Sequence, residues 1–250
     1  MSVISVRNLT KIYSKPHLFR TITTTGVLDL NFEVKEGEIF GLLGLNGSGK
    51  TTTIKLMLGL LKPTTGIVEV LGKSLSDRSV LKNIGFLPEV PYFYRYLTAF
   101  EILSLYANLS RIGGAEQKVK DMLEKVGLYE WKDKRLIEFS KGMLQRIGIA
   151  QTLLHDPSIL IYDEPVSGLD PLAIQEMRNL LVKLKSLGKT IFLSSHLISE
   201  VEKVCDRVGI IVKGRLVSVL EQKDWQKDGG LEEIFVSNVS GSNEMGRITI

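Results

Sequence analysis

A run of glycines ending in a lysine carries the clearest chemistry in the sequence. Glycine lets backbone N–H groups close around phosphate oxygens, and a helix that follows presents its positive end to the same anion. A lysine at the end of the run supplies a mobile charge to the β- and γ-phosphates, and the next hydroxyl is a ligand for Mg²⁺. The segment matches G-x-x-x-x-G-K-[ST] and consists of Gly44, Leu45, Asn46, Gly47, Ser48, Gly49, Lys50 and Thr51, followed by Thr52. It predicts a nucleoside triphosphate site, the alternative being an ordinary glycine-rich turn.

Two adjacent carboxylates follow an apolar run further along the chain. The run from Ile159 to Tyr162 is typical of a buried strand, and Asp163 and Glu164 come directly after it. Because consecutive strand residues point to opposite faces, the two acids should do different jobs. Asp163 suits a Mg²⁺ ligand that acts through water, and Glu164 suits the base that orients or deprotonates the attacking water. A solvated acidic pair in a loop is the alternative.

Strands and helices that could position these residues alternate along the chain. Short apolar runs between helical periodicities indicate an α/β domain with a largely parallel sheet. Helical spacing recurs from Ile54 to Leu61 and from Met143 to Leu154, and helix starts are predicted at Thr98 and at Asp170. The predicted buried strands are Glu38–Leu43, Ile84–Leu87, Ser158–Tyr162, Thr190–Ser194 and Arg207–Val212.

The remaining parts of the chain differ in pattern. Ser2–Asn8 and Val27–Val34 alternate like antiparallel strands, and the polar stretch Ser14–Thr25 is expected to join them. Thr98–Ala150 is predicted to be almost wholly helical. We expect one domain over 1–228, with a helical subdomain inserted at about 90–155. A partly loose tail is expected over 229–250, with one helical turn near Leu231–Phe235.

Composition excludes several classes of protein. The 250 residues are 44% hydrophobic and 24% charged, with 32 Lys and Arg against 28 Asp and Glu, a formal net charge of +4. The chain should therefore fold, and its scattered basic residues do not favour direct binding of nucleic acid. The single cysteine, Cys205, cannot form an internal disulfide and is expected to be buried. No apolar run is long enough to span a bilayer, and the first residues do not resemble a signal peptide.

The order of the motifs resembles the ATP-binding subunit of an ATP-binding cassette (ABC) transporter, from about Val3 to Leu220. The resemblance implies a P-loop NTPase core, a helical subdomain that carries a signature sequence, and ATP and Mg²⁺ as cofactors. After the glycine-rich segment the motif residues are Leu87-Pro88-Glu89, Phe139 to Arg146, Asp163-Glu164, Ser167 to Asp170, and Ser195-His196.

The resemblance also implies residue roles and a dimer. In the family, two subunits bind head to tail and trap ATP between the glycine-rich loop of one and the signature of the other. Ser140 and the backbone at Gly142 would then contact the γ-phosphate of the partner's ATP, and Asp170 would lie at the dimer seam. His196 would contact the γ-phosphate. Tyr13 resembles the aromatic residue that stacks on adenine, although it could instead cap the small sheet.

Three positions in two motifs depart from the commonest family pattern. Glu89 stands where the family usually has a glutamine that binds Mg²⁺, and a carboxylate can also serve as the metal ligand. Lys141 and Met143 stand where the usual signature has glycine and glutamine. These departures resemble the branch that exports drugs, antibiotics, ions or lipids through a separate membrane subunit. The aromatic segment Tyr92–Tyr96 follows Glu89, where the family binds that subunit, although burial in the helical insert would also explain it.

The function expected from this resemblance is an ATP-hydrolysing motor at the cytoplasmic face of the membrane. It would work with a second copy of itself and with a separate transmembrane permease subunit. The transported substance, the direction of transport and the choice between homodimer and heterodimer stay open. The alternative is a soluble ABC ATPase acting on ribosomes or DNA. A P-loop GTPase or kinase is disfavoured because the sequence has no N-K-x-D guanine motif.

Overall fold

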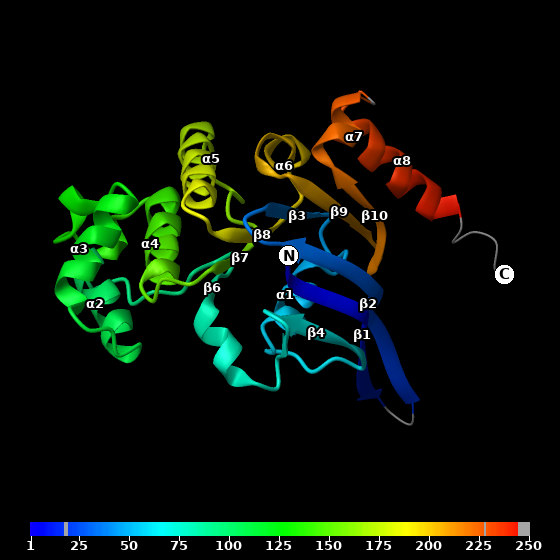
Figure 1. Ribbon diagram of the computed structural model, residues 1–250, viewed down its shortest axis with the longest axis horizontal. Helices are drawn as coiled ribbons and strands as arrows, with labels where there is room; N and C mark the ends of the chain where they lie inside the picture. Colours follow the sequence, from blue (N-terminus) through cyan, green and yellow to red (C-terminus); the bar gives the residue numbers. More distant parts are fainter. Residues whose placement is uncertain (18–19, 228, 245–250) are drawn as a thin grey trace. The chain divides into compact units, whose positions relative to one another are not determined.

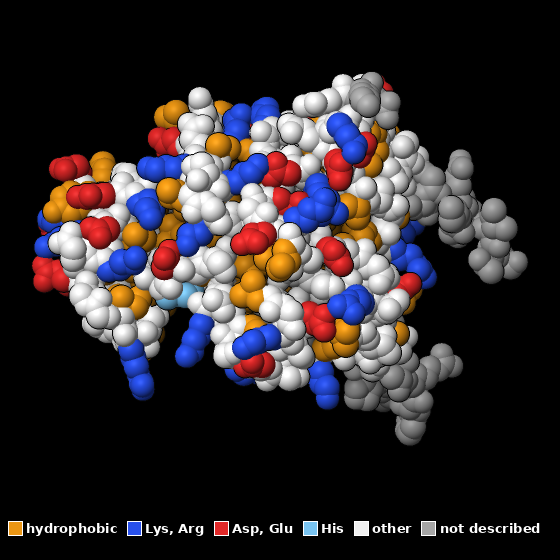
Figure 2. Space-filling model, in the orientation of Figure 1, with side chains coloured by type: hydrophobic (Ala, Val, Ile, Leu, Met, Phe, Trp, Pro, Cys, Tyr) orange, Lys and Arg blue, Asp and Glu red, His pale blue; other side chains and the backbone are white. Residues whose placement is uncertain are grey.

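The computed structural model describes residues 1–17, 20–227 and 229–244. The chain divides into two compact units, which are described separately (Figure 1): unit 1 comprises Met1–Leu81 and Thr190–Ile250, and unit 2 comprises Lys82–Lys189. The predicted α/β content is confirmed, with an antiparallel sheet near the N-terminus, parallel strands and a run of helices in unit 2. On the face shown in Figure 2, basic and acidic side chains are interspersed.

One sheet of unit 1 is antiparallel and contains the first two strands. Its order is β2-β1-β4-β5, and its pairs β1–β2, β1–β4 and β4–β5 are all antiparallel. Side chains on one face of these strands, including Ile4, Leu30 and Val34, are fully buried. The sheet therefore covers one side of a core. Its strands are β1 (Ser2–His17), β2 (Arg20–Lys35), β4 (Thr65–Val70) and β5 (Lys73–Ser74).

The predicted antiparallel pairing of the first two strands is confirmed, but both strands continue into Ser14–Thr25, which was expected only to join them. Tyr13 pairs with Thr24, and Ser14 pairs with Thr23. Threonine is β-branched and suits an extended backbone, so a threonine-rich polar segment can form a two-stranded ribbon without an apolar face. Residues 18 and 19 lie outside the described residues. The polar composition of this stretch indicated a loop, although its threonines favour a strand.

The second sheet of unit 1 holds the strands that lead to the glycine-rich segment. Strand β3 lies between β8 and β9 and is parallel to both, and β10 pairs antiparallel with β9. Both β3 and β8 are buried along their whole length, as expected for parallel strands covered on two faces. The strands are β3 (Ile39–Leu43), β8 (Thr190–Ser195), β9 (Arg207–Val212) and β10 (Arg215–Glu221); the helices of unit 1 are α1 (Lys50–Met57), α6 (Ile198–Val204), α7 (Gln222–Lys227) and α8 (Leu231–Glu244).

Three aromatic rings join the two sheets of unit 1. Phe32 of β2 stacks on Phe40 of β3 with ring centroids 5.5 Å apart, and Phe40 stacks on Phe192 of β8 at 5.8 Å. Phe40 and Phe192 are fully buried. Stacked aromatic pairs add about 0.5–1.5 kcal/mol beyond the burial of their area. The antiparallel sheet is therefore packed against the strands that hold the glycine-rich loop.

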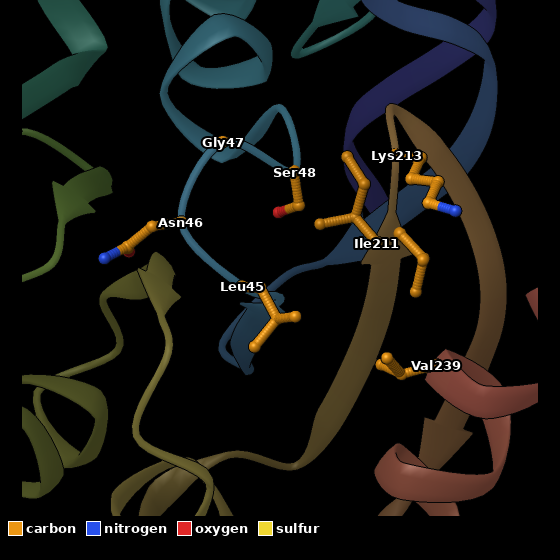
Figure 3. A pocket seen from close by; sticks show the side chains of 8 residues that line it. Leu45, Asn46, Gly47, Ser48, Ile211, Lys213 and Val239 are labelled. Atoms are coloured by element: carbon orange, nitrogen blue, oxygen red, sulfur yellow. The ribbon is translucent and has the colours of Figure 1, made fainter. Parts of the chain in front are cut away.

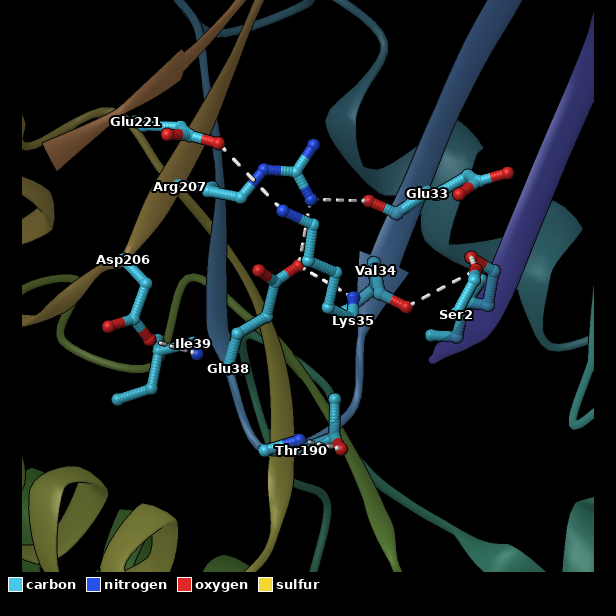
Figure 4. Close-up of polar contacts among 12 residues, drawn as sticks. Ser2, Glu33, Val34, Lys35, Glu38, Ile39, Thr190, Asp206, Arg207 and Glu221 are labelled. Carbon is cyan, nitrogen blue, oxygen red and sulfur yellow. Dashed lines mark hydrogen bonds and ion pairs between the residues drawn. The ribbon is translucent and has the colours of Figure 1, made fainter. Parts of the chain in front are cut away.

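A buried ion pair at the start of β3 and β9 fixes the same strands (Figure 4). Arg207 donates from Nη1 to Glu38 Oε1 at 3.1 Å and to the Glu33 carbonyl at 3.0 Å. Glu38 Oε1 also accepts from the Lys35 backbone N–H at 2.7 Å. The Arg207 and Glu38 side chains are only 16% and 8% exposed. Each charge is therefore compensated, and the arrangement links β2, β3 and β9.

We expect Arg207→Met to lower the free energy of unfolding by about 3 kcal/mol, because it leaves the Glu38 carboxylate buried without its cation. Lys35→Met is the matched control. Lys35 pairs with Glu221 at 3.8 Å, and both side chains are about half exposed. Loss of an exposed pair of this kind changes stability by less than about 1 kcal/mol. Urea unfolding of both variants tests the difference, and equal destabilisation would contradict a structural role for the buried pair.

Unit 2 contains two parallel strands and four α-helices. Strands β6 and β7 pair in parallel, and β7 is fully buried. The predicted helix start at Thr98 is confirmed: its side chain accepts from the Glu101 N–H, and the Glu101 carboxylate accepts from the Thr98 N–H. This capping box satisfies two of the N–H groups at the helix end. The elements are β6 (Ile84–Leu87), α2 (Ala99–Leu109), α3 (Ala115–Lys125), α4 (Lys141–Leu153), β7 (Ile159–Asp163) and α5 (Pro171–Ser186).

The helix at the C-terminal end is longer than predicted. The sequence indicated one turn near Leu231–Phe235, whereas α8 continues to Glu244. Leu231 is fully buried and Phe235 is 7% exposed, so the helix is anchored to unit 1 by its apolar residues. Such packing supplies the stability that a sequence rich in serine and asparagine lacks. Residues 245–250 of the expected loose tail lie outside the described part of the chain.

Candidate functional site

The glycine-rich loop joins β3 to α1 in unit 1, as the sequence predicts. Gly47 and Gly49 have φ angles of +78° and +111°, which side chains other than hydrogen rarely allow. A Cβ atom on Gly44 would lie 2.5 Å from the Ile211 carbonyl oxygen. Helix α1 begins at Lys50, directly after the loop. The backbone therefore turns tightly and ends at the positive end of a helix, the arrangement that binds phosphate.

Lys50 lies inside this loop. Its Nζ donates to the carbonyl oxygens of Gly44 at 2.7 Å and Leu45 at 3.2 Å, and the side chain is 6% exposed. The ammonium group can exchange such carbonyl contacts for phosphate oxygens, which carry full charge. Thr51, the next residue, is exposed at the start of α1. The structure thus places the predicted cation and hydroxyl at the same end of the helix.

A cavity of about 160 Å³ borders the loop (Figure 3). Leu45, Ile211 of β9 and Val239 of α8 point toward it, whereas Asn46 points away. The turn after β9 is bonded to the loop, since the Gly214 N–H donates to the Ser48 carbonyl at 2.9 Å. Sequence reasoning missed the contribution of β9 and α8. The apolar run of β9 was visible, but nothing local showed that it ends beside the loop.

Tyr13 lies close to the same helix. Its hydroxyl is 3.4 Å from Thr52 Oγ1, and Lys11 Nζ lies 5.5 Å from the centre of its ring. A Cβ atom on Gly26 would lie 2.7 Å from the ring, so glycine is needed there. An aromatic ring beside the start of α1 can shield one face of a nucleotide base.

His196 follows β8 at the end of the sheet where the loop begins. The Gly44 N–H donates to the Ser195 carbonyl at 3.2 Å, so the residue before His196 contacts the first residue of the loop. His196 itself is half-buried. Unit 1 therefore brings the loop, Tyr13 and His196 to one region.

The only cysteine of the sequence is buried, as predicted. Cys205 is 2% exposed, and its Sγ would lie 2.8 Å from a Cβ on Gly41.

The acidic pair lies at the end of β7 in unit 2. Asp163 and Glu164 are 4% and 5% exposed, so the alternative of a solvated acidic pair is wrong. Glu164 has a φ angle of +50°, which is unfavourable for a residue with a side chain. Strain of this kind costs about 1–3 kcal/mol and concentrates at functional sites. Burial raises the pKa of the neighbouring Tyr162 hydroxyl, which therefore stays neutral.

Unit 2 also holds the predicted signature residues. Ser140 caps α4, with its Oγ accepting from the Met143 N–H at 3.2 Å, and Asp170 caps α5, accepting from the Ala173 N–H at 2.9 Å. Gly142 packs against Ala173, where an added Cβ would approach within 3.0 Å. The two helix starts therefore lie side by side, and the Ser140 hydroxyl and the N-terminus of α4 are arranged to receive an anion.

Glu89 belongs to the same unit and lies after β6. Its Oε1 accepts from the Ser167 hydroxyl at 3.5 Å, which places it beside the segment that follows Glu164. No cluster of three or more His, Cys, Asp or Glu residues that could hold a metal is found among the residues that the structure describes. Mg²⁺ in phosphate sites needs fewer protein ligands, because phosphates and water complete its shell. Oxygen donors of the kinds that Mg²⁺ prefers are present in each unit: the Thr51 hydroxyl in unit 1, and the Glu89 and Asp163 carboxylates in unit 2.

The aromatic segment after Glu89 is mainly on the surface. Tyr92, Tyr94 and Tyr96 are 88%, 58% and 67% exposed. Burial in the helical insert is therefore the wrong explanation for these tyrosines. Phe93 alone packs inward, edge-on to Tyr106 with ring centroids 6.3 Å apart. None of the helices within the described ranges has the length and apolar character needed to cross a membrane.

Comparison with known proteins shows the family of the chain. The pattern of the family described as "ABC transporter" matches residues 27–167. The bacitracin transport ATP-binding protein BcrA of Bacillus licheniformis is 45% identical over 86% of this chain and 69% of its own length. The lantibiotic transport ATP-binding protein SrtF of Streptococcus pyogenes is 36% identical over 95% and 97%.

A solved structure shows the same fold. The cbiO1 protein of Clostridium perfringens, described as part of the ABC transporter complex cbiONQ, superposes with a TM-score of 0.80 at 26% identity over 99% of both chains. The family match covers the glycine-rich loop, Glu89, the signature and the acidic pair. The chain belongs to the ABC transporter family, as an ATP-binding subunit with an ABC ATPase domain.

Proposed function

We propose that the chain is the ATP-hydrolysing motor subunit of an exporter. The similarity to the bacitracin and lantibiotic transport proteins supports the antibiotic class of cargo. The direction is proposed from the resemblance of Glu89, Lys141 and Met143 to the exporter branch. The observation that carries the motor role is Glu164, a buried carboxylate in a strained backbone conformation at the end of β7. A group held in this way is suited to act as a general base.

The proposed reaction is attack of water on the γ-phosphate of ATP. Lys50 and the N–H groups at the start of α1 bind and orient the phosphates, and Tyr13 stacks on the adenine. Glu164 accepts the proton of the attacking water, and His196 contacts the γ-phosphate. Mg²⁺, held through Thr51, Asp163 and Glu89, would neutralise phosphate charge when bound.

A second copy of the chain completes the site in this proposal. Ser140 and the Gly142 backbone of one copy contact the γ-phosphate bound to the other, with Asp170 at the seam between the copies. Support comes from the α4 N-terminus, which has an exposed serine cap and no acidic residue in its first turn. An anion is favoured there. ATP would close the head-to-tail dimer, and hydrolysis would reopen it.

The motion would be passed to a separate transmembrane subunit at the cytoplasmic face of the membrane. The exposed tyrosines of the Tyr92–Tyr96 segment support a docking surface there, because aromatic residues and arginine are enriched in interfaces. No described feature favours the alternative role on ribosomes or DNA. Helices α2 and α3 of the insert have 11 residues each, too short for a long coiled coil.

The docking surface can be tested apart from catalysis. We expect the triple variant Tyr92→Ser, Tyr94→Ser, Tyr96→Ser to keep ATP hydrolysis by the isolated chain within about twofold, since these side chains are exposed and lie outside the phosphate site. Its recovery with solubilised native membranes should fall at least tenfold, as expected when interface aromatic residues are lost. Trp131→Ser, at a 42% exposed aromatic residue of the same unit, is the control. Equal membrane recovery of all variants would contradict the docking role.

A further inference from the structure

One short turn in unit 2 follows the proposed base and leads to α5, and the first residue of the signature helix α4 lies against it. It runs from Glu164 to Gly168, and the Ser167 N–H donates to the Glu164 carbonyl at 3.1 Å. Both ends of the turn have left-handed backbone, with φ angles of +50° at Glu164 and +64° at Gly168. Gly168 follows this hydrogen-bonded turn directly, so only three residues separate it from Glu164.

The side chain of Lys141 lies against this turn. A Cβ atom on Gly168 would lie only 2.6 Å from Lys141 Nζ and 3.7 Å from its Cε. Lys141 is the first residue of α4, next to the cap Ser140. The lysine stem therefore reaches from the signature helix to the turn that follows the proposed base.

Folding alone does not favour a lysine at this position. A cation in the first turn of a helix is repelled by the positive end of the helix dipole. Lys141 is exposed, and it makes no hydrogen bond or ion pair with any residue in the described part of the chain. Residues that oppose local preferences without a stabilising partner are expected at functional sites.

The rest of α4 packs against α5, so the backbone of Lys141 is held in place. A Cβ atom on Gly142 would lie 3.0 Å from the Ala173 Cβ, and Arg146 pairs with Glu176 at 3.5 Å. These contacts hold the start of α4 beside the start of α5. On the other side of the turn, Glu89 accepts from the Ser167 hydroxyl. The turn thus lies between Glu89 and the side chain of Lys141.

We infer that Lys141 is a positioning residue for hydrolysis, which holds the Ser167–Gly168 turn and through it the carboxylate of Glu164. The inference rests on the proposed function of Glu164. It links the signature, which would contact the partner's ATP, to the base that acts on the ATP of its own copy. Lys141 does not need to contact ATP for this role.

The test compares Lys141→Ala and Lys141→Arg with Lys183→Ala, at an exposed lysine on α5. Rates of ATP hydrolysis by the full chain give kcat and KM, and thermal unfolding gives Tm. Lys141→Ala should lower kcat about tenfold, since small displacements of a catalytic group have effects of this size or larger. Its KM should stay within twofold, and its Tm should be equal or higher because a cation leaves the first turn of a helix. Lys141→Arg should keep kcat within about threefold, and Lys183→Ala should change nothing.

Two results would overturn the inference. One is a kcat of Lys141→Ala within twofold of the unmodified chain. The other is a raised KM with unchanged kcat, which would show that Lys141 binds ATP directly. The Glu164→Gln variant, measured alongside, distinguishes failure of the proposed function from failure of the inference about Lys141. An active Glu164→Gln variant would overturn the proposed function and this inference together, whereas an inactive one beside an unaffected Lys141→Ala would overturn the inference alone.

Discussion

Glu164→Gln should hydrolyse ATP about 10²–10⁴ times more slowly than the unmodified chain while still binding it, because this is the usual contribution of a general base. The amide keeps the shape of the carboxylate but cannot accept a proton from water. Glu164 is 5% exposed, so bulk solvent has little access to replace it. Phosphate release measures turnover, and calorimetry measures the affinity for ATP.

Glu124→Gln is the matched control for this variant. Glu124 is exposed on α3 of the same unit. The control should hydrolyse ATP at the normal rate. A Glu164→Gln variant with turnover within tenfold of the unmodified chain would remove the carboxylate from the mechanism and would leave its strained backbone without a functional reason.

Lys50→Met is expected to have the second large effect, a loss of about 10²–10³-fold in kcat/KM for ATP. Removal of one preorganised donor to developing charge commonly costs this much. A ligand at about 100 times its Kd stabilises a protein by about 2.7 kcal/mol. That stabilisation by ATP should nearly disappear in the variant.

Lys55→Met serves as its control, since Lys55 is exposed on the same helix. Normal kcat/KM and a normal thermal shift with ATP are expected for this control. If Lys50→Met were stabilised by ATP as much as the control, the loop would not be the phosphate site.

The site could be predicted from sequence wherever its parts lie close together along the chain. The glycines of the loop, the cap Ser140 and the pair Asp163-Glu164 each act through backbone geometry set by neighbouring residues. Such features place several characteristic residues within a short stretch of sequence, where they can be recognised. The bounds of β6 and β9 were also predicted to the residue, because buried parallel strands are short uninterrupted apolar runs.

Features that depend on distant contacts were not predictable. Val239 reaches the cavity beside the loop only because Leu231 and Phe235 anchor α8, and the composition of that helix gives little sign of it. The contact of Lys141 with Gly168 joins residues in different elements. The hairpin through Ser14–Thr25 was missed because two polar strands stabilise each other by pairing, which single-strand patterns do not show.

The central claim is that ATP joins two copies of this chain, and the mass of the Glu164→Gln variant in solution tests it most directly. Light scattering with saturating Mg·ATP should give about twice the 27.9 kDa of one chain. The same variant without nucleotide, or with Lys50→Met added, should give the mass of one chain. A single-chain mass with ATP fully bound would contradict the account.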